Sequence, residues 1–275
     1  MTQPAEPMTS GQIRFDDGAA YERYMGVWSQ AAGEIFLDWL APSSGMRWLD
    51  IGCGNGAFTE LIVRRCAPAS VDGIDPSAAQ LAYARTRPAL SGIARFREGS
   101  AMALPFDDDA FDAAVMPLVI FFVPEPAVGV AQMARVVRPG GVVAAYAWDM
   151  HGGGFPYAAL HAEMKDFGMV VPKETRPEAS RLDVMEELWR GAGLREIETR
   201  EITVQRTYAD WDDYWTTARG GPSAGGVLAA MSAEQTDALI ARLRARLPAD
   251  AKGRITVSAR ANAIRGRVPG RPSGA

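Results

Sequence analysis

Three glycines at alternate positions, Gly52, Gly54 and Gly56, carry the clearest chemical meaning in this chain. They follow a short apolar run that ends in a carboxylate, Asp50, and they precede an apolar stretch with helical spacing, 57–63. Glycines suit a turn on which a ligand lies directly, because positive φ is allowed and no Cβ intrudes. A strand, a glycine-rich turn and a helix form the front of a nucleotide-binding α/β domain.

Three kinds of ligand are candidates for this loop. A triphosphate loop requires Gly-Lys-Ser/Thr after its last glycine, and Ala57-Phe58 stands there instead. The dinucleotide pattern fits better, since Gly52-x-Gly54-x-x-Ala57 matches its degenerate form, but a pyrophosphate favours positive potential and Asp50 is an acid. An acid suits the ammonium and sulfonium groups of S-adenosylmethionine. A turn without any ligand is the remaining alternative, which three glycines and an acid disfavour.

A second acid, Asp75, ends the next predicted strand, 71–75, about 20 residues beyond the loop. A ribose-binding carboxylate belongs at this position, because two carboxylate oxygens accept both ribose hydroxyls. Pro76 and Ser77 then begin a predicted helix, 78–87. Asp75 is equally suited to capping that helix, and the two roles are compatible.

Further motifs follow in order along the chain. Residues 93–97 alternate as in a strand, 111–116 and 142–147 form further predicted strands, and a Pro-Gly-Gly turn occupies 139–141. Together with the glycine loop, this set resembles the class I S-adenosylmethionine-dependent methyltransferases. The resemblance is to the small-molecule group that includes the ubiquinone/menaquinone methyltransferases, and it covers 48–148. The motifs are specific for cofactor and fold and say little about the acceptor.

The resemblance implies a set of cofactor-binding residues, in which Asp50 and the glycines line the methionine and ribose portion and Asp75 holds the ribose hydroxyls. Ser100 stands where the family often has Asp, so the adenine contact loses a charge-assisted hydrogen bond. The full implied set is Asp50, Gly52, Cys53, Gly54, Gly56, Asp75, Pro76, Ser77, Gln80, Ser100, Ala101, Met102, Met116, Pro117 and Leu118.

Candidate residues for the acceptor come mainly from segments beyond the glycine loop. Asp149 and His151 follow the strand at 142–147 and are the candidate general bases, and the three glycines at 152–154 predict a mobile hinge. Aromatic side chains are the candidates for substrate contact, although each is equally suited to an ordinary core position. They are Tyr21, Tyr24, Trp28, Phe121, Trp148, Trp211 and Trp215.

The composition restricts the class of protein. A net charge of −4 with no basic cluster in the body of the chain argues against nucleic acid as a partner. Cys53 and Cys66 give neither a metal-binding spacing nor a disulfide framework. The apolar run 113–123 is too short to span a bilayer, and the first residues lack the pattern of a signal peptide. We therefore expect a soluble, cytoplasmic protein without metal, nucleic acid or membrane partners.

We predict an α/β fold with a doubly wound, Rossmann-like, seven-stranded sheet, mostly parallel with an antiparallel last strand, plus helical cap inserts. Strands at 195–205 and 254–264 complete the sheet, and a capping-box sequence at 232–235 begins a helix. The predicted division is an N-terminal tail and cap helix at 1–40, a cofactor-binding core at 41–150, the remainder of the sheet at 151–265 with inserts 151–180 and 207–252 as a substrate cap, and a flexible tail at 266–275.

The predicted function is methyl transfer from S-adenosylmethionine to an oxygen, nitrogen or carbon atom of a small, partly apolar acceptor by in-line displacement. Two alternatives remain open: an NAD(P)-dependent oxidoreductase that uses the same glycine loop, and a non-catalytic S-adenosylmethionine-binding protein. Asp50 disfavours the first alternative, and intact cofactor motifs disfavour the second. The acceptor, the methylated atom, the base and the oligomeric state are not encoded in these motifs.

Overall fold

A seven-stranded sheet in the order β3-β2-β1-β4-β5-β7-β6 forms the centre of the molecule. The computed structural model describes residues 22–221 and 224–270. The first five strands pair in parallel, and β7 runs antiparallel to both β5 and β6, which confirms the predicted fold class. The strands are β1 (Arg47–Ile51), β2 (Ser70–Asp75), β3 (Ala94–Glu98), β4 (Phe111–Pro117), β5 (Val137–Trp148), β6 (Arg195–Tyr208) and β7 (Ile255–Arg267).

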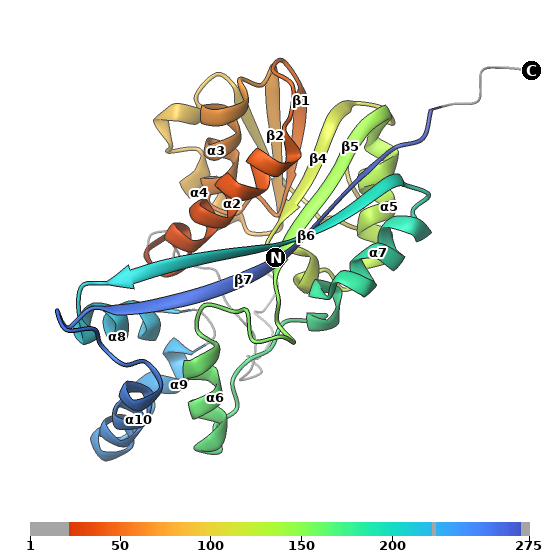
Figure 1. Ribbon diagram of the computed structural model, residues 1–275. Coiled ribbons are helices and arrows are strands. Elements are labelled where there is room, and N and C mark those ends of the chain that lie inside the picture. Colours follow the sequence, from red (N-terminus) through yellow and green to blue (C-terminus); the bar gives the residue numbers. More distant parts are fainter. Residues whose placement is uncertain (1–21, 222–223, 271–275) are drawn as a thin grey trace, which may run out of the picture.

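Helices cover both faces of the sheet, as the doubly wound prediction requires (Figure 1). One face carries α2 (Val27–Leu40), α3 (Ala57–Cys66) and α4 (Ala78–Ala84), and the other carries α5 (Pro126–Val136) and α7 (Leu182–Gly191). The central strands β1, β4 and β5 are mostly buried between them, as expected where helices cover both faces of a parallel sheet. Three short 3₁₀ helices, η2 (Pro88–Leu90), η3 (Ile120–Phe122) and η4 (Pro177–Ser180), lie in the connections.

A helical lobe lies beside one end of the sheet. We use "the lobe" for α6 (Ala158–Asp166), α8 (Trp211–Arg219), α9 (Gly225–Ala229) and α10 (Ala233–Arg246). The long strands β6 and β7 extend beyond the other strands, and the segment that joins them carries α8, α9 and α10 (Figure 1). The buried Glu163 of α6 pairs with Arg242 and Arg246 of α10. The predicted capping box at Ser232 begins α10, so this part of the sequence prediction is confirmed.

Several predicted boundaries differ from the observed ones. The helix expected at 78–87 ends at Ala84, and Arg87 has an extended backbone because the residue before a proline is excluded from helical conformation. β7 continues to Arg267, two residues into the segment predicted as a tail from 266, and the amide of Val268 still donates to the carbonyl of Gly141. Within the predicted N-terminal helix, a π-helical turn, η1 (Glu22–Gly26), precedes α2.

Asp112 joins three central strands at their amino ends. Its carboxylate accepts hydrogen bonds from the backbone and side chain of Arg47 in β1 and from Arg138 in β5. Burial acts to raise the pKa of Asp112, but the hydrogen bonds from Arg47 and Arg138 outweigh it and lower the pKa to about 2. A carboxyl whose folded pKa is depressed stabilises the fold above its unfolded pKa, and this contribution disappears as the pH falls from about 4 to about 2.

We therefore expect Asp112→Asn to lower the free energy of unfolding by about 1–2 kcal/mol at pH 7. The difference from the wild type should narrow as the pH falls toward 3, which urea unfolding across that range measures. Asp38→Asn is the matched control, because its ion pair with Arg65 is exposed and should contribute under about 1 kcal/mol. An Asp112→Asn deficit that persists unchanged at pH 3 would contradict this account.

Candidate functional site

The predicted glycine loop lies at the carboxyl end of β1, and backbone geometry explains its glycines. Gly52, Gly54 and Gly56 have φ of 69°, 50° and 80°, all in the left-handed region that favours glycine. A Cβ at Gly52 would collide with Val119, and one at Gly56 would lie 3.1 Å from Ala84. At Gly54 the nearest atoms would be 3.9 Å away or more, so a side chain there would enter open space. Gly54 is therefore the point where a ligand can lie directly on the backbone.

Asp75, at the end of β2, holds the loop and the next helix together. One carboxylate oxygen accepts from the amide of Gly54 at 2.9 Å, and the other accepts from the amide of Ser77 at 2.8 Å. Ser77 in turn caps α4 by accepting from the amide of Gln80. Burial raises the pKa of Asp75, and the two amides oppose this effect. Each carboxylate oxygen has a further lone pair, so this anchoring role leaves acceptor capacity for a ligand hydroxyl.

Asp50 is fully buried at the end of β1. One of its oxygens accepts from the Thr59 hydroxyl at 2.6 Å, while Oδ1 has no hydrogen-bond partner within the described part of the chain. Burial raises the pKa of Asp50 to about 7, with a hydrogen bond from Thr59 opposing the rise and the nearby Asp75 adding to it. A buried carboxylate with an unsatisfied oxygen is costly unless a donor or cation meets it.

A cavity of about 220 Å³ opens over these residues. It collects ten of the residues implied by the family resemblance, which are Asp50, Gly52, Cys53, Gly54, Asp75, Pro76, Ser77, Gln80, Pro117 and Leu118. Gly56 does not line it, and its role is to permit the turn into α3. Burial raises the pKa of the Cys53 thiol, so this side chain is a neutral part of the wall.

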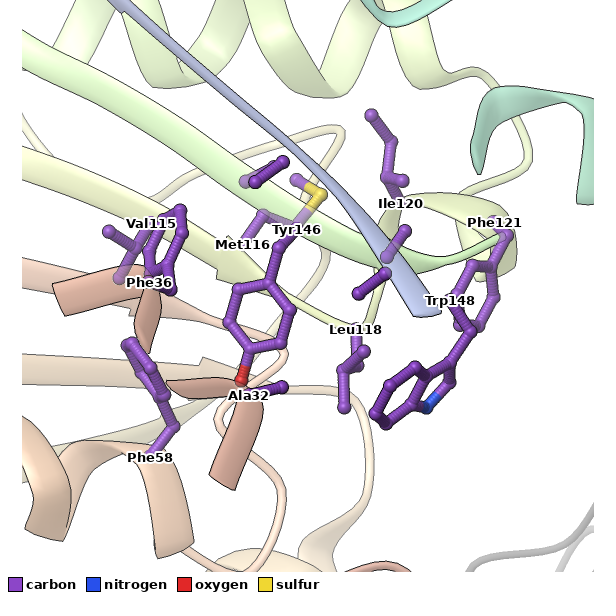
Figure 2. Packing of buried hydrophobic residues seen from close by; sticks show 14 of the residues in the cluster. Ala32, Phe36, Phe58, Val115, Met116, Leu118, Ile120, Phe121, Tyr146 and Trp148 are labelled. Atoms are coloured by element: carbon purple, nitrogen blue, oxygen red, sulfur yellow. The ribbon is translucent and has the colours of Figure 1, made fainter. Parts of the chain in front are cut away.

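The cavity has further walls that the sequence analysis did not identify. Figure 2 shows Phe58 from α3, Tyr146 from β5 and Leu118 after β4 approaching one another on this side of the sheet, and the rings of Phe58 and Tyr146 are 5.8 Å apart. The Tyr146 hydroxyl donates to the backbone carbonyl of Ser29 in α2 at 3.3 Å. Among these residues, Asn55 could have been predicted to line the cavity, because it lies between Gly54 and Gly56 in the glycine motif. The unidentified lining residues are Ser29, Asn55, Ala57, Phe58, Val119, Phe122 and Tyr146.

Besides Gly56, four residues of the implied cofactor set lie outside this cavity: Ser100, Ala101, Met102 and Met116. Met116 is fully buried and lies close to Gly129 of α5, because successive residues of a strand point to opposite faces. The hydroxyl of Ser100 accepts from the amide of Met102, so this serine stabilises its own turn. Met116 therefore faces α5, whereas its neighbours Pro117 and Leu118 line the cavity.

The two candidate bases are not part of the cavity either. Asp149 forms an ion pair with Arg260 of β7 at 2.5 Å and accepts from the amide of Gly152, so it fixes the loop that leaves β5. His151 is exposed in that turn. Burial lowers the pKa of the other histidine, His161, to about 4, and His161 packs on Phe155. The described walls of the cavity therefore contain no histidine.

Most of the aromatic candidates pack within the core. Tyr24 stacks on Tyr157, the residue that precedes α6 of the lobe, with 4.2 Å between ring centroids. Trp28 packs edge to face on Trp148, with 6.4 Å between ring centroids. Phe121 is buried beside Phe122, which is the residue that faces the cavity. Trp211 and Trp215 are half-buried in the lobe beside α10, and Tyr21 lies outside the described residues. None of the described aromatic candidates lines the cavity, so a contact of these side chains with substrate stays a prediction.

Known proteins resemble parts of this chain. A family model described as a methyltransferase domain matches residues 49–145. A ubiquinone biosynthesis O-methyltransferase of Alkalilimnicola ehrlichii is 31% identical over 178 residues, which are 59% of this chain and 71% of that protein. A chloroplastic 2-methyl-6-phytyl-1,4-hydroquinone methyltransferase 2 of Oryza sativa is 34% identical over 160 residues, 58% of this chain and 42% of that protein.

A solved structure shares the fold. The phosphoethanolamine N-methyltransferase 2 of Haemonchus contortus, in complex with S-adenosylmethionine, superposes with a TM-score of 0.59 at 18% identity, over 96% of this chain and 62% of that one. The chain spans less than half the length of several curated relatives, including the rice enzyme.

The open space at Gly54 gives a direct test of ligand contact. We expect Gly54→Ala to lower stability by about 1–2 kcal/mol through its positive φ, and to weaken S-adenosylhomocysteine binding about tenfold or more because the new methyl group enters the cavity. Gly45→Ala has the same kind of φ, 74°, and equally open surroundings, but lies away from the cavity. Thermal unfolding of both variants measures the effect of backbone strain, and calorimetric titration measures the effect on ligand binding. Equal affinities of Gly54→Ala and Gly45→Ala for S-adenosylhomocysteine would show that the ligand does not lie against Gly54.

Proposed function

Because this chain belongs to the class I S-adenosylmethionine-dependent methyltransferases, we propose that it transfers a methyl group from this cofactor to a small, partly apolar acceptor. What we propose is the class of acceptor and the role of each residue in the cavity. The observation that carries it is a buried oxygen of Asp50 beneath the glycine loop that has no partner among the described residues, beside a second carboxylate at Asp75.

The cavity fits a ligand with positive charge and ribose hydroxyls. Asp50 offers a desolvated carboxylate, whose attraction for an ammonium group is strengthened by the low local dielectric. Asp75 offers acceptor positions that its two backbone bonds leave open. A pyrophosphate would bring negative charge against both acids, so the NAD(P)-dependent alternative is disfavoured by the same atoms.

The residues of this chain would act mainly by binding and alignment. When bound, S-adenosylmethionine supplies an activated methyl group on a sulfonium sulfur. Asp50 and Asp75 would fix the methionine and ribose parts of the cofactor next to Gly54, and the rings of Phe58 and Tyr146 would exclude water from the remaining space. Holding reactants in line and desolvating the nucleophile lower the barrier without a proton transfer.

The remaining walls favour an uncharged acceptor. Phe58, Leu118, Val119 and Phe122 are apolar, and among the described lining residues the only carboxylates are the two assigned to the cofactor. A neutral, partly apolar molecule is therefore a better match than a charged one. Two relatives are named as methyltransferases of ubiquinone biosynthesis and of a phytyl hydroquinone, and these names agree with an acceptor of that general character.

The first experiment is calorimetric titration with S-adenosylhomocysteine and, separately, with NADH. We expect micromolar binding of the first and none of the second. Asp75→Asn should weaken S-adenosylhomocysteine binding about tenfold or more, because it replaces a charged acceptor at the ribose. Binding of NADH alone would overturn the proposal in favour of a reductase, and cofactor binding without turnover on any acceptor would favour the non-catalytic alternative.

The raised pKa of Asp50 predicts a pH dependence of cofactor binding. At pH 6 most molecules carry a neutral Asp50, since its pKa is about 7, and binding of the ammonium group then requires loss of that proton. Affinity for S-adenosylhomocysteine should therefore rise about tenfold between pH 6 and pH 8. Titration in buffers of different ionisation enthalpy would detect the released proton. In Asp50→Asn both the pH dependence and the proton release should be absent; if they persist, another group is responsible.

A further inference from the structure

Arg87 lies at the junction of three elements around the cofactor loop. Its side chain is only 14% exposed, at the residue that precedes η2. The guanidinium Nε donates to the backbone carbonyl of Asn55 at 2.6 Å, and the two terminal nitrogens donate to Glu60 of α3 and to Glu22 of η1, each at 2.8 Å. A planar guanidinium can serve three directions at once, which an ammonium group cannot reproduce.

Glu22 closes this cluster from the other side. The carboxylate oxygen that accepts from Arg87 also accepts from the side-chain amide of Asn55 at 2.7 Å. Asn55 is 2% exposed, lines the cofactor cavity, and accepts from the amide of Ala57 at the start of α3. We use "the clasp" for Glu22, Asn55, Glu60 and Arg87. Through the clasp, a residue of the N-terminal segment determines the position of a residue of the glycine loop.

The segment that carries Glu22 also has contacts on its opposite side. Tyr157 stacks on Tyr24 and donates to the Tyr24 carbonyl at 2.8 Å, and Arg206 of β6 donates to the carbonyl of Arg23. Three residues beyond η1, Ser29 forms part of the cavity wall. The segment 22–29 therefore runs between the glycine loop and the aromatic packing near the lobe. It is π-helical at its start, a geometry that often marks functional sites.

We infer that Glu22 and Arg87 are positioning residues for cofactor binding: the clasp couples the placement of the N-terminal segment to that of the glycine loop. This inference rests on the proposed function. Arg87 touches no part of the cavity itself and acts through the carbonyl of Asn55 and through Glu22. Loss of the clasp leaves Glu22 and Glu60 without their shared cation. The segment 22–29 and the glycine loop, which each form part of the cavity wall, are then no longer held in place relative to each other.

The test compares rates of S-adenosylhomocysteine dissociation, measured by stopped-flow fluorescence, in Arg87→Met, Arg87→Lys and Glu22→Gln. We expect dissociation about tenfold faster in Arg87→Met, with little change in the association rate, because altered contacts act mainly on dissociation. Arg87→Lys should not restore the wild-type dissociation rate, since lysine keeps the positive charge but lacks the planar guanidinium that donates in three directions. Hydrogen exchange should show that the ligand protects residues 22–29 less in Arg87→Met than in the wild type.

Arg64→Met is the matched control. Arg64 and Glu34 form an exposed ion pair at 3.1 Å that also joins α3 to α2, but it lies outside the cavity and the clasp. Its dissociation rate and exchange pattern should equal those of the wild type. If the wild type binds and Arg87→Met and Glu22→Gln release the ligand at the wild-type rate, the clasp is purely structural and this inference fails alone. If Arg87→Lys releases the ligand at the wild-type rate, the positive charge of residue 87 and not the planar geometry of its guanidinium is sufficient, and that part of the inference fails. A wild type that does not bind overturns the proposed function and this inference with it.

Discussion

The sharp turn from β1 into α3 depends on two acceptors supplied by the neighbouring strand β2. The carbonyl of Ile74 accepts from the amides of Gly52 and Cys53, and the carboxylate of Asp75 accepts from that of Gly54. These bonds hold three consecutive backbone donors in place, and positive φ at the glycines permits the arrangement. Because Asp75 also binds the amide of Ser77, the position of the loop and the start of α4 are determined together.

A second constraint acts from outside the sheet. Long strands β6 and β7 place the lobe next to the N-terminal segment, and a cluster of tyrosines fills the junction. The hydroxyls of Tyr157 and Tyr208 lie 3.2 Å apart, and burial raises the pKa of both, so the cluster stays neutral. Neutral, hydrogen-bonded aromatic packing gives a rigid support for Ser29 and the cap helix α2, which form one side of the cavity.

The sequence predicted those parts of the fold that depend on local chemistry. The glycine loop, both acids and the capping box of α10 rest on short-range patterns, and the sheet follows from buried apolar runs. The roles of Trp28, Trp148 and Asp149 could not be predicted, because an aromatic on a helix or a strand has the same spacing whether it faces a ligand or a second ring. Asp149 has its partner, Arg260, 111 residues away, and only the completed sheet brings them together.

The burial of Asp50 supports the proposal that a ligand, and not packing, satisfies its carboxylate. In the part of the chain that the structure describes, no donor other than Thr59 reaches its carboxylate, and a neutral carboxyl at its raised pKa leaves Oδ1 without a partner. A fold selected for stability alone would place an apolar residue here, since an unsatisfied buried polar group is destabilising. The same unsatisfied oxygen becomes favourable once a cation lies against it. The proposed role of Asp50 therefore follows from its position: a buried carboxylate beneath the glycine loop gains most from a ligand that carries positive charge.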